Sequence, residues 1–339
     1  MTRPVWLSAF TAVICLLPPL SSAAPVTLER IQVHGASLEG NLERNAVDRE
    51  VLVFLPASYQ KERKRRYPVV YALHGYSIGA QQWTTEIKVP QTLDAAFAAG
   101  VREMIVVLPD SKTVHNGSMY SSSVTTGDFE NFIARDLVAH IDSHYRTLPE
   151  RKSRGLVGHS MGGYGATRIG MKHAEVFGAL YIMSPCCLSV RAAPPAETEK
   201  ILAEVKTPAD SAKLSFLARA TLATAAAWSP NPDNPPLYLD LPLSNGQPQA
   251  EVLGKWAANA PLAFVDQYTA NLKRYAAIAI DVGDQDGLRV DTAKLQAALT
   301  RNGIASTFEE YKGTHTSAVD VRFRDFVMPF FGKHLAFAK

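Results

Sequence analysis

The chain has 339 residues, of which 47% are hydrophobic, 20% charged and 9% aromatic. This balance is that of a globular protein with a sizeable core, and it excludes disordered, collagen-like and coiled-coil chains. Lys and Arg number 35 against 32 Asp and Glu, which gives a net charge of +3. Because a nucleic-acid surface needs clustered basic residues, so small an excess spread along the chain argues against a nucleic-acid partner.

The first two dozen residues have the pattern of an export signal. Arg3 supplies a positive charge, Val5 to Leu20 form an apolar stretch, and Ser21 to Ala24 offer small residues for cleavage. Two adjacent prolines keep the apolar run below the ~20 residues that a membrane span needs. We therefore expect a signal peptide over residues 1–23, a mature protein that is secreted or periplasmic, and no stable insertion into a membrane.

Short apolar runs rich in β-branched residues alternate with segments of helical period from residue 26 onward. This alternation is typical of an α/β protein with a mostly parallel sheet. The first two runs, 26–33 and 50–55, are predicted to pair in antiparallel fashion. Further strands are predicted at 67–73, 104–108, 153–158 and 177–183, and helices at 129–145, with Asp128 as N-cap, and at 161–172.

Residues 192–272 interrupt this alternation. Two Ala-rich helical stretches flank a Pro- and Asn-rich segment there, and the sequence shows no strand pattern. The alternation then resumes with predicted strands at 276–282 and 305–311 and predicted helices at 291–302 and 319–335. We therefore expect one α/β domain over residues 24–339 with a helical, cap-like insert, whose segment 228–248 is a candidate lid over the site.

Residues 158–162 read Gly-His-Ser-Met-Gly, which fits the pattern G-x-S-x-G between a predicted strand and a predicted helix. In this context the pattern indicates a nucleophile elbow, a turn so sharp that only glycine fits at its flanks. Ser160 would project from the strand–helix junction, where the helix N-terminus favours developing negative charge. A structural serine in a glycine turn is the alternative interpretation.

A serine nucleophile needs a base, and the base needs a group that orients it. In a sheet of this kind both follow the serine, in the order acid and then histidine. The strand at 276–282 is followed by two acidic residues, at the edge of the sheet that also carries the elbow. Asp286 is the predicted acid of the triad, and Asp284 is the second candidate. His315 follows the next predicted strand and is the predicted base, whereas His334 lies in the final helix.

Ester hydrolysis also needs N–H donors for the developing oxyanion, each of which lowers the barrier by about 3 kcal/mol. One donor is expected from the backbone of Met161, directly after the serine. The second is expected from the loop that follows the strand at 67–73. There Gly75 permits a tight turn and leaves the N–H of Tyr76 free to point into the site.

This chemistry requires no cofactor and no metal. The acids after the strand at 276–282 do not fit a calcium loop, because Val282 and Ala293 would take its first and last ligand positions. His140 and His144 stand four residues apart on a predicted helix, but the Glu of a HExxH pattern is missing between them. We interpret these two histidines as part of a solvated helix edge.

Cys186 and Cys187 are the two cysteines outside the export signal, and they are adjacent. A disulfide between neighbours would close a strained ring and join no distant segments. Both are therefore expected to be packed thiols.

Five segments of the chain resemble those of a known family: Leu73-His74-Gly75, Tyr120-Ser121-Ser122, residues 158–166, Gly283 to Asp286, and Gly313-Thr314-His315. They resemble the esterase D family of α/β-hydrolases. That family includes S-formylglutathione hydrolases, feruloyl and acetyl-xylan esterases, enterochelin esterases and the antigen 85 mycolyltransferases. The resemblance runs from about residue 51 to residue 331, and the insert has no counterpart in it.

The resemblance implies an α/β-hydrolase fold, with helices on both faces of the sheet. It also implies Ser160 as nucleophile, Asp286 as acid and His315 as base, with the amides of Tyr76 and Met161 as oxyanion hole. These are the roles reached independently from motif context and chain order. One departure is that Thr-Ser-Ala follows His315, where many family members carry an aromatic residue.

The predicted function is that of an exported serine carboxylic-ester hydrolase, which forms an acyl-enzyme from a small-molecule or carbohydrate ester. The export signal argues against a cytosolic role in formylglutathione hydrolysis. Two alternatives are open. The same residues could transfer the acyl group to a sugar or lipid alcohol, or the scaffold could be a binding protein without catalysis.

Overall fold

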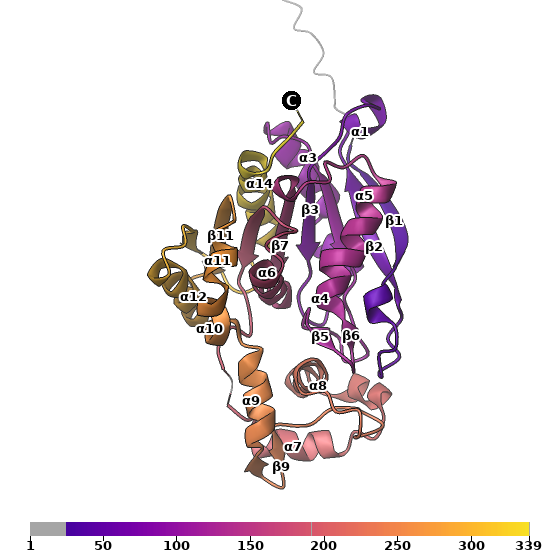
Figure 1. The fold of residues 1–339 in the computed structure, drawn as a ribbon, viewed down its shortest axis with the longest axis vertical. Helices are drawn as coiled ribbons and strands as arrows, with labels where there is room; N and C mark the ends of the chain where they lie inside the picture. The colour runs from indigo at the N-terminus through magenta and orange to yellow at the C-terminus, as the bar shows by residue number, and fades with distance from the viewer. Residues whose placement is uncertain (1–24, 191, 339) are drawn as a thin grey trace, which may run out of the picture.

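The computed structural model describes residues 25–190 and 192–338, so the predicted signal peptide lies outside the described residues. An eight-stranded sheet in the order β1-β2-β4-β3-β7-β8-β11-β12 forms the body of the protein (Figure 1). Strands β1 and β2 enter antiparallel, and the six strands from β4 to β12 run parallel, as predicted. The strands are β1 (Thr27–His34), β2 (Asp48–Leu55), β3 (Val69–Leu73), β4 (Ile105–Pro109), β7 (Arg154–His159), β8 (Ala179–Met183), β11 (Ala277–Gly283) and β12 (Thr307–Tyr311).

Alternate residues of the buried strands fill two cores, one on each face of the sheet. In β3, Val69, Tyr71 and Leu73 face one core, and Val70 and Ala72 face the other. This follows from the two-residue period of a strand. Because both faces of the strand are buried, its sequence is apolar throughout, which is typical of a parallel sheet.

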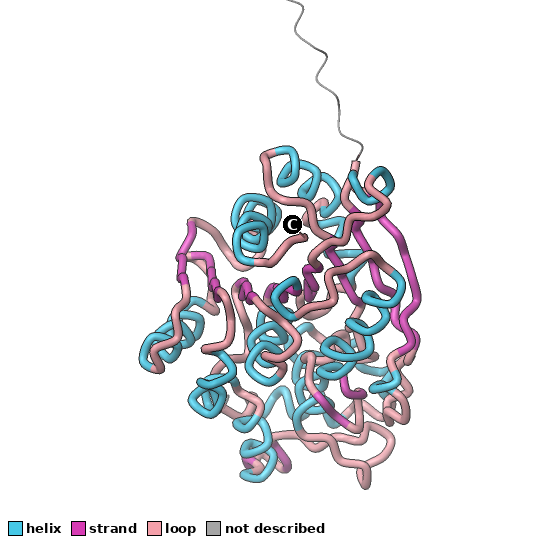
Figure 2. Tube along the Cα trace, turned by 45° about the horizontal axis from the view of Figure 1, so that its top comes forward, coloured by secondary structure: helices cyan, strands magenta, loops and turns pink. Residues whose placement is uncertain are grey.

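Helices cover both faces of the sheet, as Figure 2 shows. The first core is closed by α4 (Phe129–Asn131), η2 (Phe132–Leu137), α5 (Val138–His144), α6 (Met161–Lys172) and α12 (Arg289–Arg301). The second core is closed by α2 (Ala80–Glu86), α3 (Val89–Ala98), α13 (Val319–Arg322), η6 (Phe323–Val327) and α14 (Met328–His334). The α/β-hydrolase architecture expected from the sequence is thereby confirmed.

The helix predicted over residues 129–145 is present, with a π-helical stretch, η2, in its middle. Asp128 caps its N-terminus, because its Oδ1 accepts the N–H of Asn131 at 2.9 Å. Three helices and one small hairpin before β7 were not predicted. These are α1 (Ser58–Lys61), α2, α3 and the small hairpin of β5 (Ser122–Ser123) and β6 (Gly127–Asp128).

The insert lies between β8 and β11 in sequence, and its residues 196–258 form the lower end of the molecule in Figure 1. The expectation that it holds no strand is wrong, because β9 (Leu243–Ser244) and β10 (Gln247–Pro248) pair as a hairpin. The turn residues Asn245 and Gly246 both have positive φ, as an Asn-Gly hairpin turn requires. Its other elements are α7 (Ala196–Ala203), η4 (Pro208–Lys213), α8 (Phe216–Trp228), α9 (Ala250–Ala258), α10 (Pro261–Phe264), η5 (Val265–Tyr268) and α11 (Thr269–Leu272).

Buried polar contacts fix the insert to the body of the protein. The indole N–H of Trp228 donates to Ser121 Oγ at 3.1 Å, and the hydroxyl of Ser123 donates to the Ala226 carbonyl at 2.6 Å. The hydroxyl of Tyr164 donates to the Asn259 carbonyl at 2.9 Å. Since the partners that the body contributes, Ser121, Ser123 and Tyr164, lie in the β5 region and on α6, the insert is packed on the same elements that position the site.

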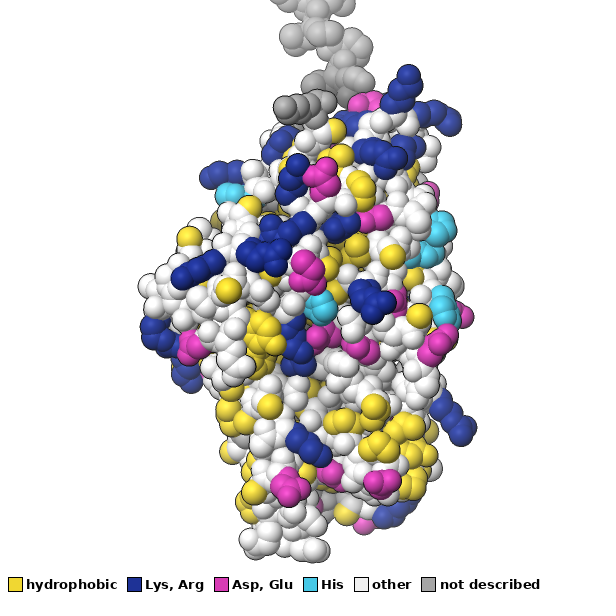
Figure 3. All heavy atoms as spheres, viewed as in Figure 1, with side chains coloured by type: hydrophobic (Ala, Val, Ile, Leu, Met, Phe, Trp, Pro, Cys, Tyr) yellow, Lys and Arg dark blue, Asp and Glu magenta, His cyan; other side chains and the backbone are white. Residues whose placement is uncertain are grey.

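On the face shown in Figure 3, Lys and Arg side chains are spread over the body of the protein with Asp and Glu between them. Within residues 25–190 and 192–338, no helix combines the length and the apolar character needed to cross a bilayer. Cys187 lies in the first core and Cys186 packs against it, as expected for packed cysteine side chains.

Candidate active site

The turn between β7 and α6 has the geometry of a nucleophile elbow. Ser160 adopts φ 59° and ψ −114°, a strained conformation that a non-glycine residue takes only when its surroundings impose it. A Cβ on Gly158 would overlap the carbonyl of Gly162, and a Cβ on Gly162 would overlap the carbonyl of Leu73. The two glycines of the motif are therefore required by the close approach of β7, α6 and β3.

Ser160, His315 and Asp286 form one chain of hydrogen bonds. His315 Nδ1 lies 2.8 Å from Asp286 Oδ2, and its Nε2 lies 2.9 Å from Ser160 Oγ. Because an ionised carboxylate only accepts, Nδ1 carries the proton that it donates to Asp286. Nε2 is then unprotonated and accepts the hydroxyl proton of Ser160. The structure thus brings together the three residues that the sequence singled out.

Asp286, and not the reserve candidate Asp284, faces the histidine. The Asp286 side chain is 1% exposed, and it also accepts the N–H of Leu288 at 2.8 Å. Burial alone would raise the pKa of Asp286, but the hydrogen bonds from His315 and Leu288 outweigh it, so its pKa lies below the usual value. Asp284 instead accepts from Lys312 at 2.9 Å and from the Gly313 amide at 3.1 Å.

The two predicted oxyanion residues lie beside the serine. Met161 begins α6, and the first amides of a helix have no partner within it. The loop of Tyr76 passes close to the nucleophile, since a Cβ on Gly75 would lie 3.5 Å from Ser160 Cβ. The side chains of Tyr76 and Met161 meet at Gly117, where an added Cβ would lie 2.6 Å and 2.7 Å from them.

A buried acid–imidazole pair supports the Tyr76 loop, and the sequence analysis missed it. Tyr76 donates its hydroxyl to the carbonyl of His115 at 2.9 Å. The imidazole of His115 lies 3.3 Å from Glu43, and both side chains are fully buried. Burial raises the pKa of Glu43 to about 7 and lowers the pKa of His115 to about 4. Near pH 6 the pair is therefore a neutral carboxylic acid beside a neutral imidazole.

The wild-type protein is expected to lose stability as the pH rises, because Glu43 is buried, and Glu43→Gln is expected to abolish this part of the loss. The pKa of Glu43 rises from its ordinary 4.5 to about 7 on folding, so the folded state binds more protons between these values. The free energy of unfolding then falls as the pH rises through this window. At about 1.4 kcal/mol per pH unit, the loss from this residue is roughly 3 kcal/mol by pH 8.

Urea unfolding of the wild type and Glu43→Gln at pH 5 and pH 8 measures this effect. Glu251→Gln, at an exposed residue of the insert, is the control and should keep the wild-type pH dependence. If Glu43→Gln loses as much stability between pH 5 and pH 8 as the wild type does, the buried carboxyl is not the cause.

A pocket of about 310 Å³ opens beside Ser160 and His315. Its apolar wall comes from Tyr76, Ile78, Trp83, Ile87, Phe216 and Val319, and its acidic rim from Glu86 and Asp320. Among the described residues of the insert, Phe216 is the one that lines this pocket. Its ring is 61% exposed and packs edge-on against Tyr76, with the centroids 5.2 Å apart.

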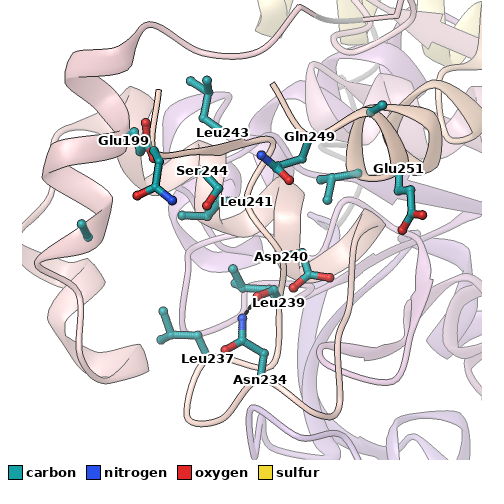
Figure 4. A pocket seen from close by; sticks show the side chains of 14 residues that line it. Glu199, Asn234, Leu237, Leu239, Asp240, Leu241, Leu243, Ser244, Gln249 and Glu251 are labelled. Carbon is teal, nitrogen blue, oxygen red and sulfur yellow. Dashed lines mark hydrogen bonds between the residues drawn. The ribbon is translucent and has the colours of Figure 1, made fainter. Parts of the chain in front are cut away.

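The expectation that segment 228–248 forms a lid over the site is wrong. Among the described residues, none of that segment lines the pocket of Ser160. Several of its residues instead line a separate cavity of about 740 Å³ within the insert, with Glu199 of α7 and Glu251 of α9 (Figure 4). The segment is held there by its own contacts, such as the Asn234 amide donating to the Leu239 carbonyl at 2.8 Å.

No group of three or more His, Cys, Asp or Glu side chains within residues 25–190 and 192–338 is arranged to hold a metal ion. His140 and His144 stack on each other, with ring centroids 4.0 Å apart, along α5. His334 likewise packs on the ring of Phe330 in α14.

A family model described as "Putative esterase" matches residues 44–335. The chain belongs to the esterase family. This agrees with the resemblance of five of its segments to the esterase D family. The endo-1,4-beta-xylanase/feruloyl esterase of Xylanibacter ruminicola is 30% identical to this chain over 138 residues, which are 39% of this chain and 19% of the relative. The chain thus spans about a fifth of the length of that curated relative.

Solved structures share the fold of this esterase over nearly its whole length. A ferulic acid esterase has a TM-score of 0.66 at 21% identity, covering 92% of this chain and 99% of that one. An S-formylglutathione hydrolase of Staphylococcus aureus has a TM-score of 0.61 at 13% identity, covering 91% and 100%. These likenesses establish the α/β-hydrolase fold.

Proposed function

We propose that this esterase is an exported serine carboxylic-ester hydrolase that works through an acyl-enzyme. The observation that carries the proposal is the hydrogen-bonded chain of Ser160, His315 and Asp286 at the elbow, with distances of 2.9 Å and 2.8 Å. A serine, an imidazole and a buried carboxylate in this order are the parts that nucleophilic acyl transfer needs.

In the first half of the reaction, Ser160 Oγ attacks the ester carbonyl while His315 Nε2 takes the hydroxyl proton. The C–O bond to the alcohol then breaks, and His315 returns the proton to the departing alkoxide. In the second half, a water gives its proton to His315 and attacks the acyl-serine, which releases the carboxylic acid and restores the hydroxyl of Ser160. Asp286 holds the imidazole and stabilises its charged form throughout.

The negative charge on the carbonyl oxygen develops next to the N-terminus of α6. The amides of Met161 and Tyr76 are the proposed donors to it, and the positive end of the helix adds to their effect. Gly75 allows the second donor to approach, since its backbone lies against the serine without a side chain between them.

A fluorophosphonate probe tests the proposed nucleophile. The purified mature protein is incubated with the probe and its mass is measured intact and after peptide mapping. We expect one adduct, on Ser160. A folded protein that takes up no probe, or takes it up on another residue, would show that Ser160 is not an activated nucleophile.

We further propose that the pocket receives an apolar, flat acyl group. Its wall is built from aromatic and aliphatic side chains, and Phe216 presents an exposed ring at its mouth. A relative and a solved structure named for feruloyl and ferulic acid esterase point to an aromatic acid of this kind. The acidic rim, formed by Glu86 and Asp320, is compatible with an ester whose alcohol part is neutral, such as a carbohydrate.

Phe216→Ala is expected to raise KM for a hydroxycinnamate ester about 10-fold, because it removes the ring from the mouth of the pocket. Turnover of 4-nitrophenyl acetate should stay within about 2-fold, since an acetyl group is too small to reach the ring. Leu217→Ala is the matched control, because Leu217 is 75% exposed and lies outside the pocket. Equal loss on both esters would argue against an acyl contact.

We infer export from the sequence pattern of residues 1–23, a segment that lies outside the described residues. We propose that this segment is removed during secretion. Expression of the full chain in a bacterial host, followed by fractionation and N-terminal sequencing, should give a protein outside the cytoplasm that begins near Ala24. A cytoplasmic protein that retains residues 1–23 would contradict export.

A further inference from the structure

His159 precedes the nucleophile and occupies a variable position of the motif, so the reaction itself gives it no role. It is the last residue of β7 and is 6% exposed. Its side chain does not point to solvent but lies between two loops of the site. On one side is the Gly75 loop, since a Cβ on Gly75 would lie 3.9 Å from His159 Nδ1.

On the other side is the loop of the general base. His159 Nε2 lies 2.8 Å from the carbonyl oxygen of His315. Since a carbonyl only accepts, the ring of His159 carries its proton on Nε2 and donates it. The two imidazoles also pack together, with centroids 4.8 Å apart and planes tilted by 32°. One side chain thus contacts both the backbone and the ring of the general base.

We propose that His159 is a positioning residue, which holds the His315 loop at the place from which His315 reaches both Ser160 and Asp286. This inference rests on the proposed function of the triad. The same loop is also held by Asp284, which accepts the N–H of Gly313. His159 supplies a further contact, at the carbonyl of His315 itself.

The charge of His159 is compatible with this role. Burial, and next the neighbouring His315, lower the pKa of His159 to about 4, so its imidazole is neutral at pH 7. His315 becomes an imidazolium during each half-reaction, and a second charged imidazole 4.8 Å away would oppose that step. A neutral donor holds the loop without this repulsion.

The test compares His159→Gln with His159→Leu. Gln can place an amide N–H where the imidazole Nε2–H was, whereas Leu fills space without a donor. We expect His159→Leu to lower kcat about 10- to 100-fold with KM within 2-fold, because a small displacement of a catalytic group has an effect of this size. His159→Gln should keep kcat within about 5-fold. His144→Leu, at an exposed residue of α5, is the control and should match the wild type.

Each rate is expressed per site that the fluorophosphonate labels, so that misfolded protein is not counted. If kcat per labelled site of His159→Leu equals that of the wild type, or if Gln and Leu lower it equally, the positioning role is wrong. The wild-type labelling at Ser160 is read separately. A wild type that is not labelled there rejects the proposed function itself, whatever the His159 variants do.

Discussion

Ser160→Ala is expected to lower kcat by on the order of 10⁶-fold while the protein remains folded. The variant removes the atom that forms the bond to the acyl group, and within the described part of the chain the hydroxyl bonded to His315 Nε2 is that of Ser160. Hydrolysis of 4-nitrophenyl acetate measures the loss, and circular dichroism with thermal unfolding checks the fold. Residual activity well above solvent hydrolysis is expected from the oxyanion donors and binding alone.

Ser143→Ala is the matched control, because Ser143 is an exposed serine of α5 that bonds only locally, to His140 and His144. It should leave kcat unchanged. Ester turnover that survives intact in Ser160→Ala would refute the triad assignment and would favour a scaffold with a different site.

Asp286→Asn is expected to lower kcat about 10⁴-fold, as the same change does in a studied serine protease. The amide of Asn donates to Nδ1 of His315, which moves the imidazole proton to Nε2. In that tautomer Nε2 cannot accept the proton of Ser160. Since the pKa of Asp286 lies below its usual value, the wild-type carboxylate is ionised over the pH range of the assay.

The reserve acid provides the control for this prediction. Asp284→Asn should keep kcat within a few-fold, because the side-chain oxygen of Asn can still accept the N–H of Gly313 and Asp284 does not contact the histidine. Both variants are measured over pH 5 to 9 with the same ester. If Asp284→Asn causes the larger loss, the assignment of the acid is reversed.

The parts of the site that lie close in sequence were predictable. The elbow is encoded within residues 158–162, because the crossing of β7, α6 and β3 leaves no room for a Cβ at Gly158 or Gly162. The acid and the histidine were predictable from chain order alone, since each follows a strand whose carboxyl end meets the same edge of the sheet. The alternation of buried strands likewise predicted both cores.

What could not be predicted depends on contacts between distant residues. Phe216 reads as the first residue of an Ala-rich helix, and only the packing of α8 brings its ring to Tyr76. Glu43 and His115 are 72 positions apart in sequence, and nothing in either segment marks them as a buried pair. The Asn-Gly turn of the β9–β10 hairpin is different, because that dipeptide is a hairpin signal that could have been read.

The sheet order has a consequence for how activity appears during folding. Ser160 and His315 are 155 residues apart, and they meet only when β8 has paired with β7 and β11 has paired with β8 in register. Long-range parallel pairing of this kind is slow to form. Labelling by a fluorophosphonate during refolding should therefore lag behind the recovery of helical signal, so that the probe marks only those molecules whose sheet is complete.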